Sequence, residues 1–261
     1  MRLKIYQVDA FTSRPFEGNP AAICPLEEWL SDDQMQQIAM ENNLSESAFF
    51  VKQDGGYRLR WFTPTTEVDL CGHATLASAH VIFEHLGYDQ KEIKFDSNSG
   101  ELIVAEEGNR LVMNFPTAKL KKAEVPDFLE ETIGIHATEL YRDTDYLYVV
   151  ESEEQVRKLD PDIREIEKAD VRGIIVTAPS ESSEIDFVSR FFAPAVGVDE
   201  DPVTGSAHTM LAPYWSQRIG KDQLVGRQVS RRGGTVYCHH QGDRVSLSGE
   251  ACTFLEGNIE I

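Results

Sequence analysis

An acidic side chain, Glu46, stands among small and large apolar residues in the segment 44–50. Serines on either side can hydrogen-bond its carboxylate, and the neighbouring leucine and phenylalanines can exclude water from it. Partial burial raises the pKa of a carboxyl group towards neutrality, which suits a group that must both accept and return a proton. Glu46 is therefore a candidate general acid/base. The alternative is a structural glutamate that hydrogen-bonds the backbone where a helix meets a strand.

A second carboxylate, Asp201, opens the segment 201–208, which follows a strand-like run and leads into a helix-like run. The turn Thr204-Gly205-Ser206 precedes that helix. The first N–H groups of a helix have no partner within it, and the helix dipole places positive charge at the same end. Such a helix start suits a bound carboxylate. Asp201 is thus an acid beside an expected anion-binding position.

The chain contains an internal repeat. Residues 60–64 and 68–69 match residues 190–194 and 198–199, and each pair is separated by 130 positions. After the shared segment, Cys71-Gly72-His73-Ala74 corresponds to Thr204-Gly205-Ser206-Ala207 with a slip of three residues. The repeat predicts a duplicated fold with two lobes, residues 1–118 and 119–261, each presenting the N-terminus of a helix.

The elements around these residues read as alternating strands and a few helices. An expected first strand, residues 3–11, is followed by the turn Gly18-Asn19-Pro20. Asn19 is either a turn residue or a group that faces the substrate. Ser31 and Gln34 form a capping-box pattern at the start of a helix. Residues 74–86 are small or apolar on nearly every side, which predicts a buried helix wrapped by strands, and residues 211–219 continue a second one.

Composition excludes several classes of function. The chain has 261 residues, 41% of them hydrophobic, and a net charge of −19, so it has ample core material and would repel nucleic acids and anionic membranes. No apolar run is long enough to span a membrane and no signal peptide is seen, so we expect a cytoplasmic protein. The four cysteines and seven histidines show no CxxC or HExxH spacing, so neither a disulfide nor a metal site is predicted.

Five motifs, in the same order along the chain, resemble the phenazine-biosynthesis isomerase PhzF and its homologues. They are Asp9-Ala10-Phe11 with Gly18-Asn19-Pro20, Asn43-Leu44-Ser45-Glu46-Ser47, Phe62-Thr63-Pro64, Gly72-His73-Ala74-Thr75 and Asp201-Pro202-Val203-Thr204-Gly205-Ser206-Ala207. The resemblance implies an α+β, diaminopimelate epimerase-like fold. It would have two pseudo-symmetric lobes, each with a curved, mostly antiparallel sheet wrapped around a central buried helix, and an active site between them.

The same resemblance implies roles for individual residues. Glu46 matches the family's acid/base, Asp201 matches its second carboxylate, and four further residues match positions that line the site and hold the substrate, namely Gly72, His73, Gly205 and Ser206. It also implies that the protein uses no metal or organic cofactor and forms a homodimer.

Cys71 is a further candidate. The phenazine enzyme has an apolar residue at this position, whereas amino-acid epimerases of the same fold use a cysteine in a comparable Cys-Gly turn. A cysteine at a helix N-terminus has a lowered pKa and could act as a base. The second lobe has Thr204 where such an epimerase would have its partner thiol. A small buried thiol is therefore the favoured interpretation.

We hypothesise a cofactor-independent isomerase that moves a proton on a small amino or hydroxy carboxylic acid. Glu46 would be the central base, and Asp201, His73 and Ser206 would assist, with His73 hydrogen-bonding or protonating the substrate. One alternative is an epimerase in which Cys71 is a base. Another is a small-molecule-binding protein that keeps the pocket and has lost catalysis.

Overall fold

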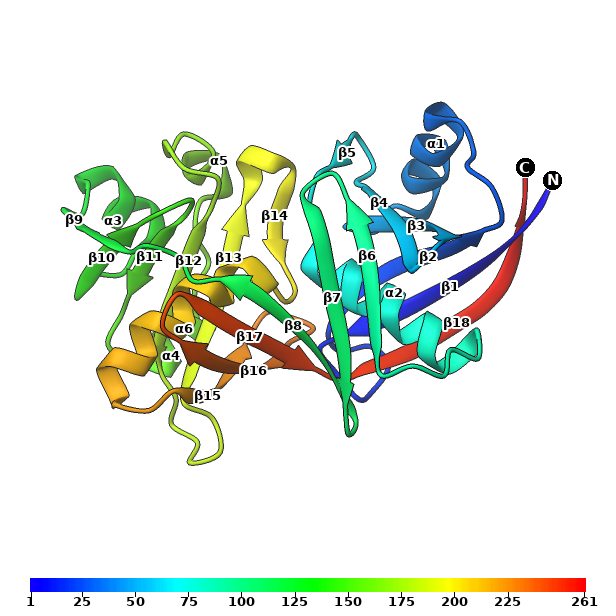
Figure 1. The fold of residues 1–261 in the computed structure, drawn as a ribbon. Helices are drawn as coiled ribbons and strands as arrows, with labels where there is room; N and C mark the ends of the chain where they lie inside the picture. Colours follow the sequence, from blue (N-terminus) through cyan, green and yellow to red (C-terminus); the bar gives the residue numbers. More distant parts are fainter. The chain divides into compact units, whose positions relative to one another are not determined.

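The computed structural model describes all residues, 1–261, and divides them into two compact units (Figure 1). Unit 1 comprises residues 1–114 and 248–261, and unit 2 comprises residues 115–247. The C-terminal boundary differs from the expected one, which gave all residues after 118 to the second lobe. The cause is the last strand, β18 (Ala251–Glu260), which pairs antiparallel along the whole of β1 (Arg2–Ala10). Unit 1 is therefore built from both ends of the chain.

Unit 1 is a mixed, mostly antiparallel sheet around one helix. Its strands pair in the order β18–β1–β2–β3–β4–β6–β7–β8, with β5 also beside β4, and only the pairs β2–β3 and β4–β6 are parallel. The further strands are β2 (Asn19–Leu26), β3 (Glu46–Gln53), β4 (Gly56–Phe62), β5 (Glu67–Val68), β6 (Glu92–Ser97), β7 (Gly100–Glu107) and β8 (Arg110–Pro116).

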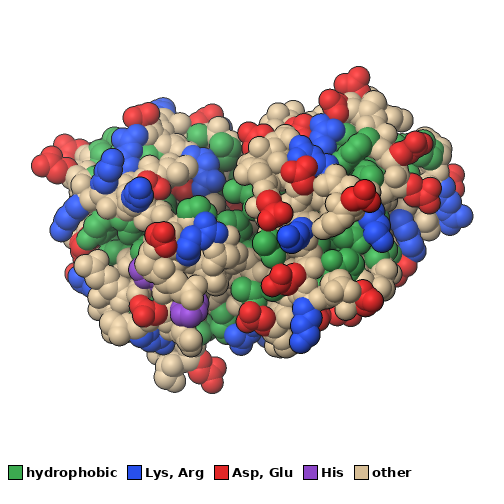
Figure 2. Space-filling view, viewed as in Figure 1, with side chains coloured by type: hydrophobic (Ala, Val, Ile, Leu, Met, Phe, Trp, Pro, Cys, Tyr) green, Lys and Arg blue, Asp and Glu red, His purple; other side chains and the backbone are tan.

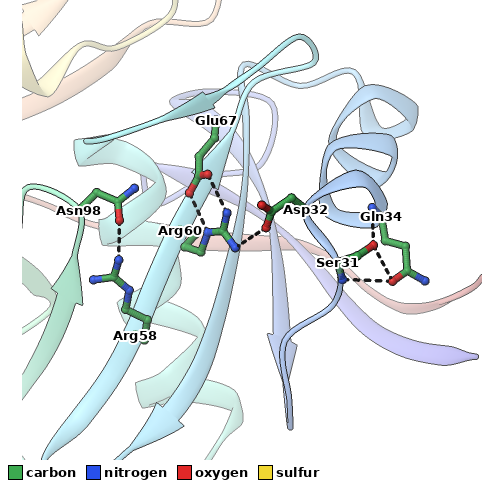
Figure 3. A network of polar contacts seen from close by, with 7 residues as sticks. All are labelled: Ser31, Asp32, Gln34, Arg58, Arg60, Glu67 and Asn98. Carbon is green, nitrogen blue, oxygen red and sulfur yellow. Dashed lines mark hydrogen bonds and ion pairs between the residues drawn. The ribbon is translucent and has the colours of Figure 1, made fainter.

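The helix at the centre of unit 1 is α2 (Gly72–His85), which packs against β1, β2, β3 and β18. Nine of its residues are buried, including seven consecutive ones, 73–79, as expected for a sequence that is apolar on nearly every side. A shorter helix, α1 (Asp32–Asn42), packs against β3 and β4 and begins with the predicted capping box of Ser31 and Gln34 (Figure 3).

Unit 2 repeats this design. Its strands pair in the order β9–β10–β11–β12–β13–β15–β16, with β14 also beside β13, and the parallel pairs β11–β12 and β13–β15 correspond to β2–β3 and β4–β6. The elements are β9 (Lys121–Ala123), α3 (Asp127–Ile133), β10 (Glu139–Arg142), β11 (Tyr146–Val149), α4 (Glu153–Arg157), α5 (Ile163–Ile166), β12 (Ile174–Pro179), β13 (Phe187–Ala193), the 3-10 turn η1 (Pro194–Val196), β14 (Val198–Asp201), α6 (Gly205–Ile219), β15 (Gln223–Gln228), β16 (Gly234–Gln241) and β17 (Arg244–Gly249).

The central helix of unit 2 is α6, which packs against β15 and β16 and has nine buried residues, the same number as α2. The repeat extends to the helix that follows the first strand of the first parallel pair in each unit, β2 in unit 1 and β11 in unit 2. In unit 2 this helix is α4, and it begins with a capping box of Ser152 and Gln155, as α1 does with Ser31 and Gln34. The two units therefore share connectivity, strand direction and helix-start chemistry.

A half-buried arginine–glutamate ion pair between neighbouring strands occurs in both units. Arg60 on β4 donates two hydrogen bonds of 2.7 Å to Glu67 on β5, and its other nitrogen contacts Asp32 (Figure 3). In unit 2, Arg190 on β13 donates to Glu200 on β14 at 2.6 and 2.9 Å. Such bidentate pairs fix the relative position of two strands as well as their charge.

The register of these strands corrects one detail of the predicted alignment. Trp61 lies opposite Val68, and its counterpart Phe191 lies opposite Asp201. The structural equivalent of Val68 is therefore Asp201, not Val198, and the slip of three residues falls before β14. The additional residues lie in the turn that contains η1, between β13 and β14.

Acidic and basic side chains are interspersed over the face shown in Figure 2, although the net charge is −19. Alternating signs are typical of a solvated surface. None of the helices combines the length and the apolar character that crossing a membrane would require.

Each central helix carries a buried histidine near its start. His73 on α2 and His208 on α6 are 5% and 0% exposed. Burial lowers the pKa of His73 to about 3 and that of His208 to about 4, although the hydrogen bond of His208 to the Thr204 carbonyl opposes its shift. Both imidazoles are therefore neutral at physiological pH.

These two histidines predict a loss of stability in mild acid. The unfolded chain protonates them near their ordinary pKa of 6.5, whereas the folded protein resists protonation down to about pH 4 and about pH 3, so stability falls as the pH falls through this window. Between about pH 7 and pH 5 each histidine should cost about 2 kcal/mol of the free energy of unfolding, measured by urea denaturation. In His208→Gln the fall should be about half as large. If the free energy of unfolding of His208→Gln falls between pH 7 and pH 5 as much as that of the wild type, the lowered pKa of His208 is contradicted.

Candidate active site

The start of α2 in unit 1 gathers five of the predicted site residues. Glu46 begins β3, Asn19 begins β2, and Cys71 precedes the first turn of α2, which contains Gly72 and His73. The parallel pairing of β2 with β3 places Glu46 opposite Ala21, so that two strand starts and one helix start meet. Asn19, Cys71 and His73 are buried, and the Glu46 side chain is 16% exposed.

His73 is the centre of this group. Its Nδ1 atom lies 3.3 Å from the amide nitrogen of Asn19 and 3.5 Å from the sulfur of Cys71, and its Nε2 atom lies 3.3 Å from Oε2 of Glu46. An amide N–H can only donate, so Nδ1 accepts and the ring proton of this neutral histidine sits on Nε2. The proton therefore faces the Glu46 carboxylate. The contact has the distance of a hydrogen bond but not its alignment.

Cys71 is the N-cap residue of α2, and its backbone is extended. The side chain makes no capping hydrogen bond, unlike that of Ser31 at the start of α1. Its carbonyl accepts from the backbone N–H and the hydroxyl of Thr75 at 3.1 and 2.6 Å. This arrangement fixes the first turn of α2 without using the thiol, which lies against His73 instead.

The corresponding helix start in unit 2 is organised around Asp201. The Thr204 hydroxyl donates to Oδ2 of Asp201 at 2.5 Å, so the Thr204 side chain does not cap α6. Gln228, which is fully buried, accepts from the Thr204 N–H at 2.9 Å and donates to the Asp201 carbonyl at 2.7 Å. The side-chain amide of Gln228 thus bonds both ends of the turn 201–204. Gln228 was not a candidate from sequence, since no local motif contains it.

Unit 2 also brings an arginine to the start of α6. Arg172 donates to both oxygens of Asp145, at 2.9 and 2.5 Å, and to the hydroxyl of Ser206 at 3.0 Å. Its guanidinium carbon lies 5.4 Å from the centre of the Phe191 ring. Burial opposes the charge of Arg172, but the bonds to Asp145 and the charges of Asp145 and Asp201 raise its pKa above the ordinary value.

Sequence reasoning missed Arg172. It lies 27 residues from Asp145 and 34 from Ser206. The pairing of β11 with β12 brings Arg172 beside Asp145, because these two residues precede the paired strands. Ser206 can act as a hydrogen-bond donor to a ligand. Its oxygen accepts from Arg172, so its hydroxyl hydrogen can be donated to another group. A cation, a hydroxyl and a helix N-terminus therefore converge at the predicted substrate-binding residues Gly205 and Ser206.

The two helix starts are alike. Cys71 and Thr204 both have extended backbones, neither side chain caps its helix, and a glycine follows each, Gly72 and Gly205. Helices whose first N–H groups are not capped by a side chain can bind an anion there. One group of side chains could hold a metal ion, namely Glu46, Cys71 and His73, each of which offers one ligand atom within 4.8 Å of the others.

Comparisons with known proteins agree with this fold. The family model described as phenazine biosynthesis-like protein matches residues 8–257. The chain is 51% identical to Uncharacterized isomerase PA2770 of Pseudomonas aeruginosa over the whole of both chains. It matches the crystal structure of a PhzF family protein of Enterococcus faecalis with a TM-score of 0.97 and 42% identity, covering 100% of both chains.

A more distant likeness concerns the fold alone. A hydroxyproline epimerase of Agrobacterium vitis shares 10% identity and gives a TM-score of 0.60 over 99% of this chain and 92% of that one. The paired units, each with a helix inside a curved sheet, thus occur in epimerases as well. The chain belongs to the PhzF family of phenazine biosynthesis-like proteins, and it is an isomerase with the diaminopimelate epimerase-like fold.

Proposed function

We propose that this isomerase moves a proton on a small amino or hydroxy carboxylic acid without a cofactor, and that Glu46 is the group that takes up and returns the proton. The observation that carries the proposal is the distance of 3.3 Å between Oε2 of Glu46 and Nε2 of a neutral, buried His73. A largely buried carboxylate beside a fixed hydrogen-bond donor suits general acid/base catalysis.

His73 acts as a hydrogen-bond donor in this proposal, not as a proton source. With a pKa of about 3, an imidazolium form would be too rare at neutral pH to protonate a substrate. Asn19 positions His73, because its amide N–H at Nδ1 keeps the ring proton on Nε2. The His73 N–H then orients the Glu46 carboxylate, or stabilises negative charge that develops on the substrate.

The Arg172 and Ser206 group supports a carboxylate as the recognised part of the substrate. A cation held by Asp145 and a serine hydroxyl that accepts from that cation lie at the uncapped start of α6. Charge-assisted hydrogen bonds from such donors are roughly twice as strong as neutral ones. Asp201, held by Thr204 and Gln228, is the second carboxylate of the proposed reaction and would exchange the proton at the other substrate position.

Replacement of Glu46 by glutamine should remove the proton transfer while leaving the fold intact. We expect deuterium uptake from D2O into amino and hydroxy carboxylic acids, followed by NMR, to fall about 100-fold or more, since general bases contribute about that much. Glu41→Gln is the matched control, because Glu41 is an exposed carboxylate in the same unit, and it should exchange normally.

Undiminished deuterium uptake in Glu46→Gln would contradict the role of Glu46 as the general acid/base. Absence of uptake in the folded wild-type protein across a broad panel, with ligands seen to bind, would favour the alternative of a binding protein without catalysis.

Replacement of Arg172 tests the carboxylate-binding role. Arg172→Lys keeps the charge but loses the planar contact with Asp145 and Ser206, so we expect KM to rise about tenfold with a smaller change in kcat. Arg142→Lys is the control, since Arg142 also pairs with an aspartate, Asp170, but at the surface. A fall in kcat alone, with KM unchanged, would contradict this role for Arg172.

A second candidate function is an epimerase in which Cys71 is one of the bases. The contact of its sulfur with Nδ1 of His73 at 3.5 Å favours this alternative, because an imidazole can accept a thiol proton once Asn19 no longer donates to the same nitrogen. It predicts that Cys71→Ala abolishes turnover, whereas a Glu46-centred reaction retains it. Full activity of Cys71→Ala in the deuterium assay would end the alternative.

A further inference from the structure

Three potential metal ligands meet at the start of α2. Glu46 offers a carboxylate oxygen, Cys71 a sulfur and His73 an imidazole nitrogen, all within 4.8 Å of one another. They come from two elements, because Glu46 begins β3 whereas Cys71 and His73 flank the first residue of α2. No spacing rule along the chain relates Glu46 to the other two, so a search for metal motifs in the sequence does not find them.

The separation of two of these ligands already matches a zinc site. The distance from Nε2 of His73 to Oε2 of Glu46 is 3.3 Å. Two ligands at about 2.0–2.1 Å from a tetrahedral zinc ion lie about 3.3–3.4 Å apart. The sulfur of Cys71 lies within 4.8 Å of both other ligand atoms, and thiolate ligands lie about 2.3 Å from zinc.

A second observation points to a ligand at this position. Nε2 of His73 is buried, and its 3.3 Å contact with Glu46 is not aligned as a hydrogen bond, so this atom has no aligned partner in the structure. A buried polar atom of this kind is costly unless something binds it.

The surroundings also fit the second shell of a metal site. When Nε2 binds a metal, the ring proton moves to Nδ1 and needs an acceptor. Asn19 lies 3.3 Å from Nδ1, and rotation of its amide by half a turn would present the oxygen in place of the nitrogen. Partners of this kind orient the ligating histidine in metal sites.

We propose that Glu46, Cys71 and His73 form a zinc-binding site, and that zinc bound there stops the isomerase. A thiol, an imidazole and a carboxylate favour zinc over magnesium or calcium, which prefer oxygen ligands. On binding, the Cys71 thiol and zinc form a sulfur–metal bond and the thiol proton passes to solvent. The fourth position is left for water. The inhibition, though not the binding, rests on the proposed function, because the metal occupies the Glu46 carboxylate.

Cobalt(II) is the probe for binding, since it takes zinc geometry and shows a thiolate charge-transfer absorption. We expect one cobalt ion per chain with this absorption, displaced by one equivalent of zinc. Cys71→Ala should lose the absorption and bind zinc at least 100-fold more weakly by calorimetry. Cys252→Ala, which removes another free cysteine of the same unit, should behave as the wild type. His73→Gln provides a second variant should Cys71→Ala fail to fold.

Failure of this inference is distinguishable from failure of the proposed function. No cobalt absorption in the wild type, or absorption that persists in Cys71→Ala, overturns the site whatever the activity. If the site binds zinc, deuterium uptake should stop with one equivalent of zinc and return with a chelator. Uptake that continues in the zinc-loaded protein overturns the inhibition, whereas a chelated protein that never exchanges deuterium counts against the proposed function alone.

Discussion

The burial of two helix starts without side-chain caps is the constraint on which the rest of the structure depends. The helices α2 and α6 lie inside their sheets because they are apolar on most sides, and most residues of their first turns are buried with them. Buried N–H groups need partners, and a capping serine or aspartate would supply one at once. Cys71 and Thr204 do not, since the thiol contacts His73 and the hydroxyl is donated to Asp201. Both positions are therefore suited to a ligand that brings its own acceptor.

The duplication explains why two such positions exist and also why they differ. Sheet order, parallel pairings, capping boxes and the pairs Arg60–Glu67 and Arg190–Glu200 recur in both units. The side chains beside the helix starts have diverged. Unit 1 has a neutral imidazole and a carboxylate, which suit proton exchange. Unit 2 has Arg172 and Ser206, which suit a carboxylate of the substrate.

Much of this arrangement could be predicted from sequence because it depends on local patterns. The capping box at Ser31, the two buried helices and the grouping of Cys71 with His73 follow from spacing along one element. The family resemblance added the fold. The contacts that position the site could not be predicted in this way. The Arg172 and Gln228 bonds join segments more than 20 residues apart, and they form only once sheet order has placed those segments side by side.

The return of β18 to unit 1 has a consequence for the order in which the protein is made. The strand pairs with β1 along its whole length and also packs against α2, yet in the chain it follows all of unit 2. During translation, all of unit 2 is therefore synthesised before the strand that completes unit 1. Unit 1, which contains Glu46, is therefore the first unit to be started and the last to be completed. Arg172, Asp145 and Ser206 are all synthesised before β18, the strand that packs against β1 and α2.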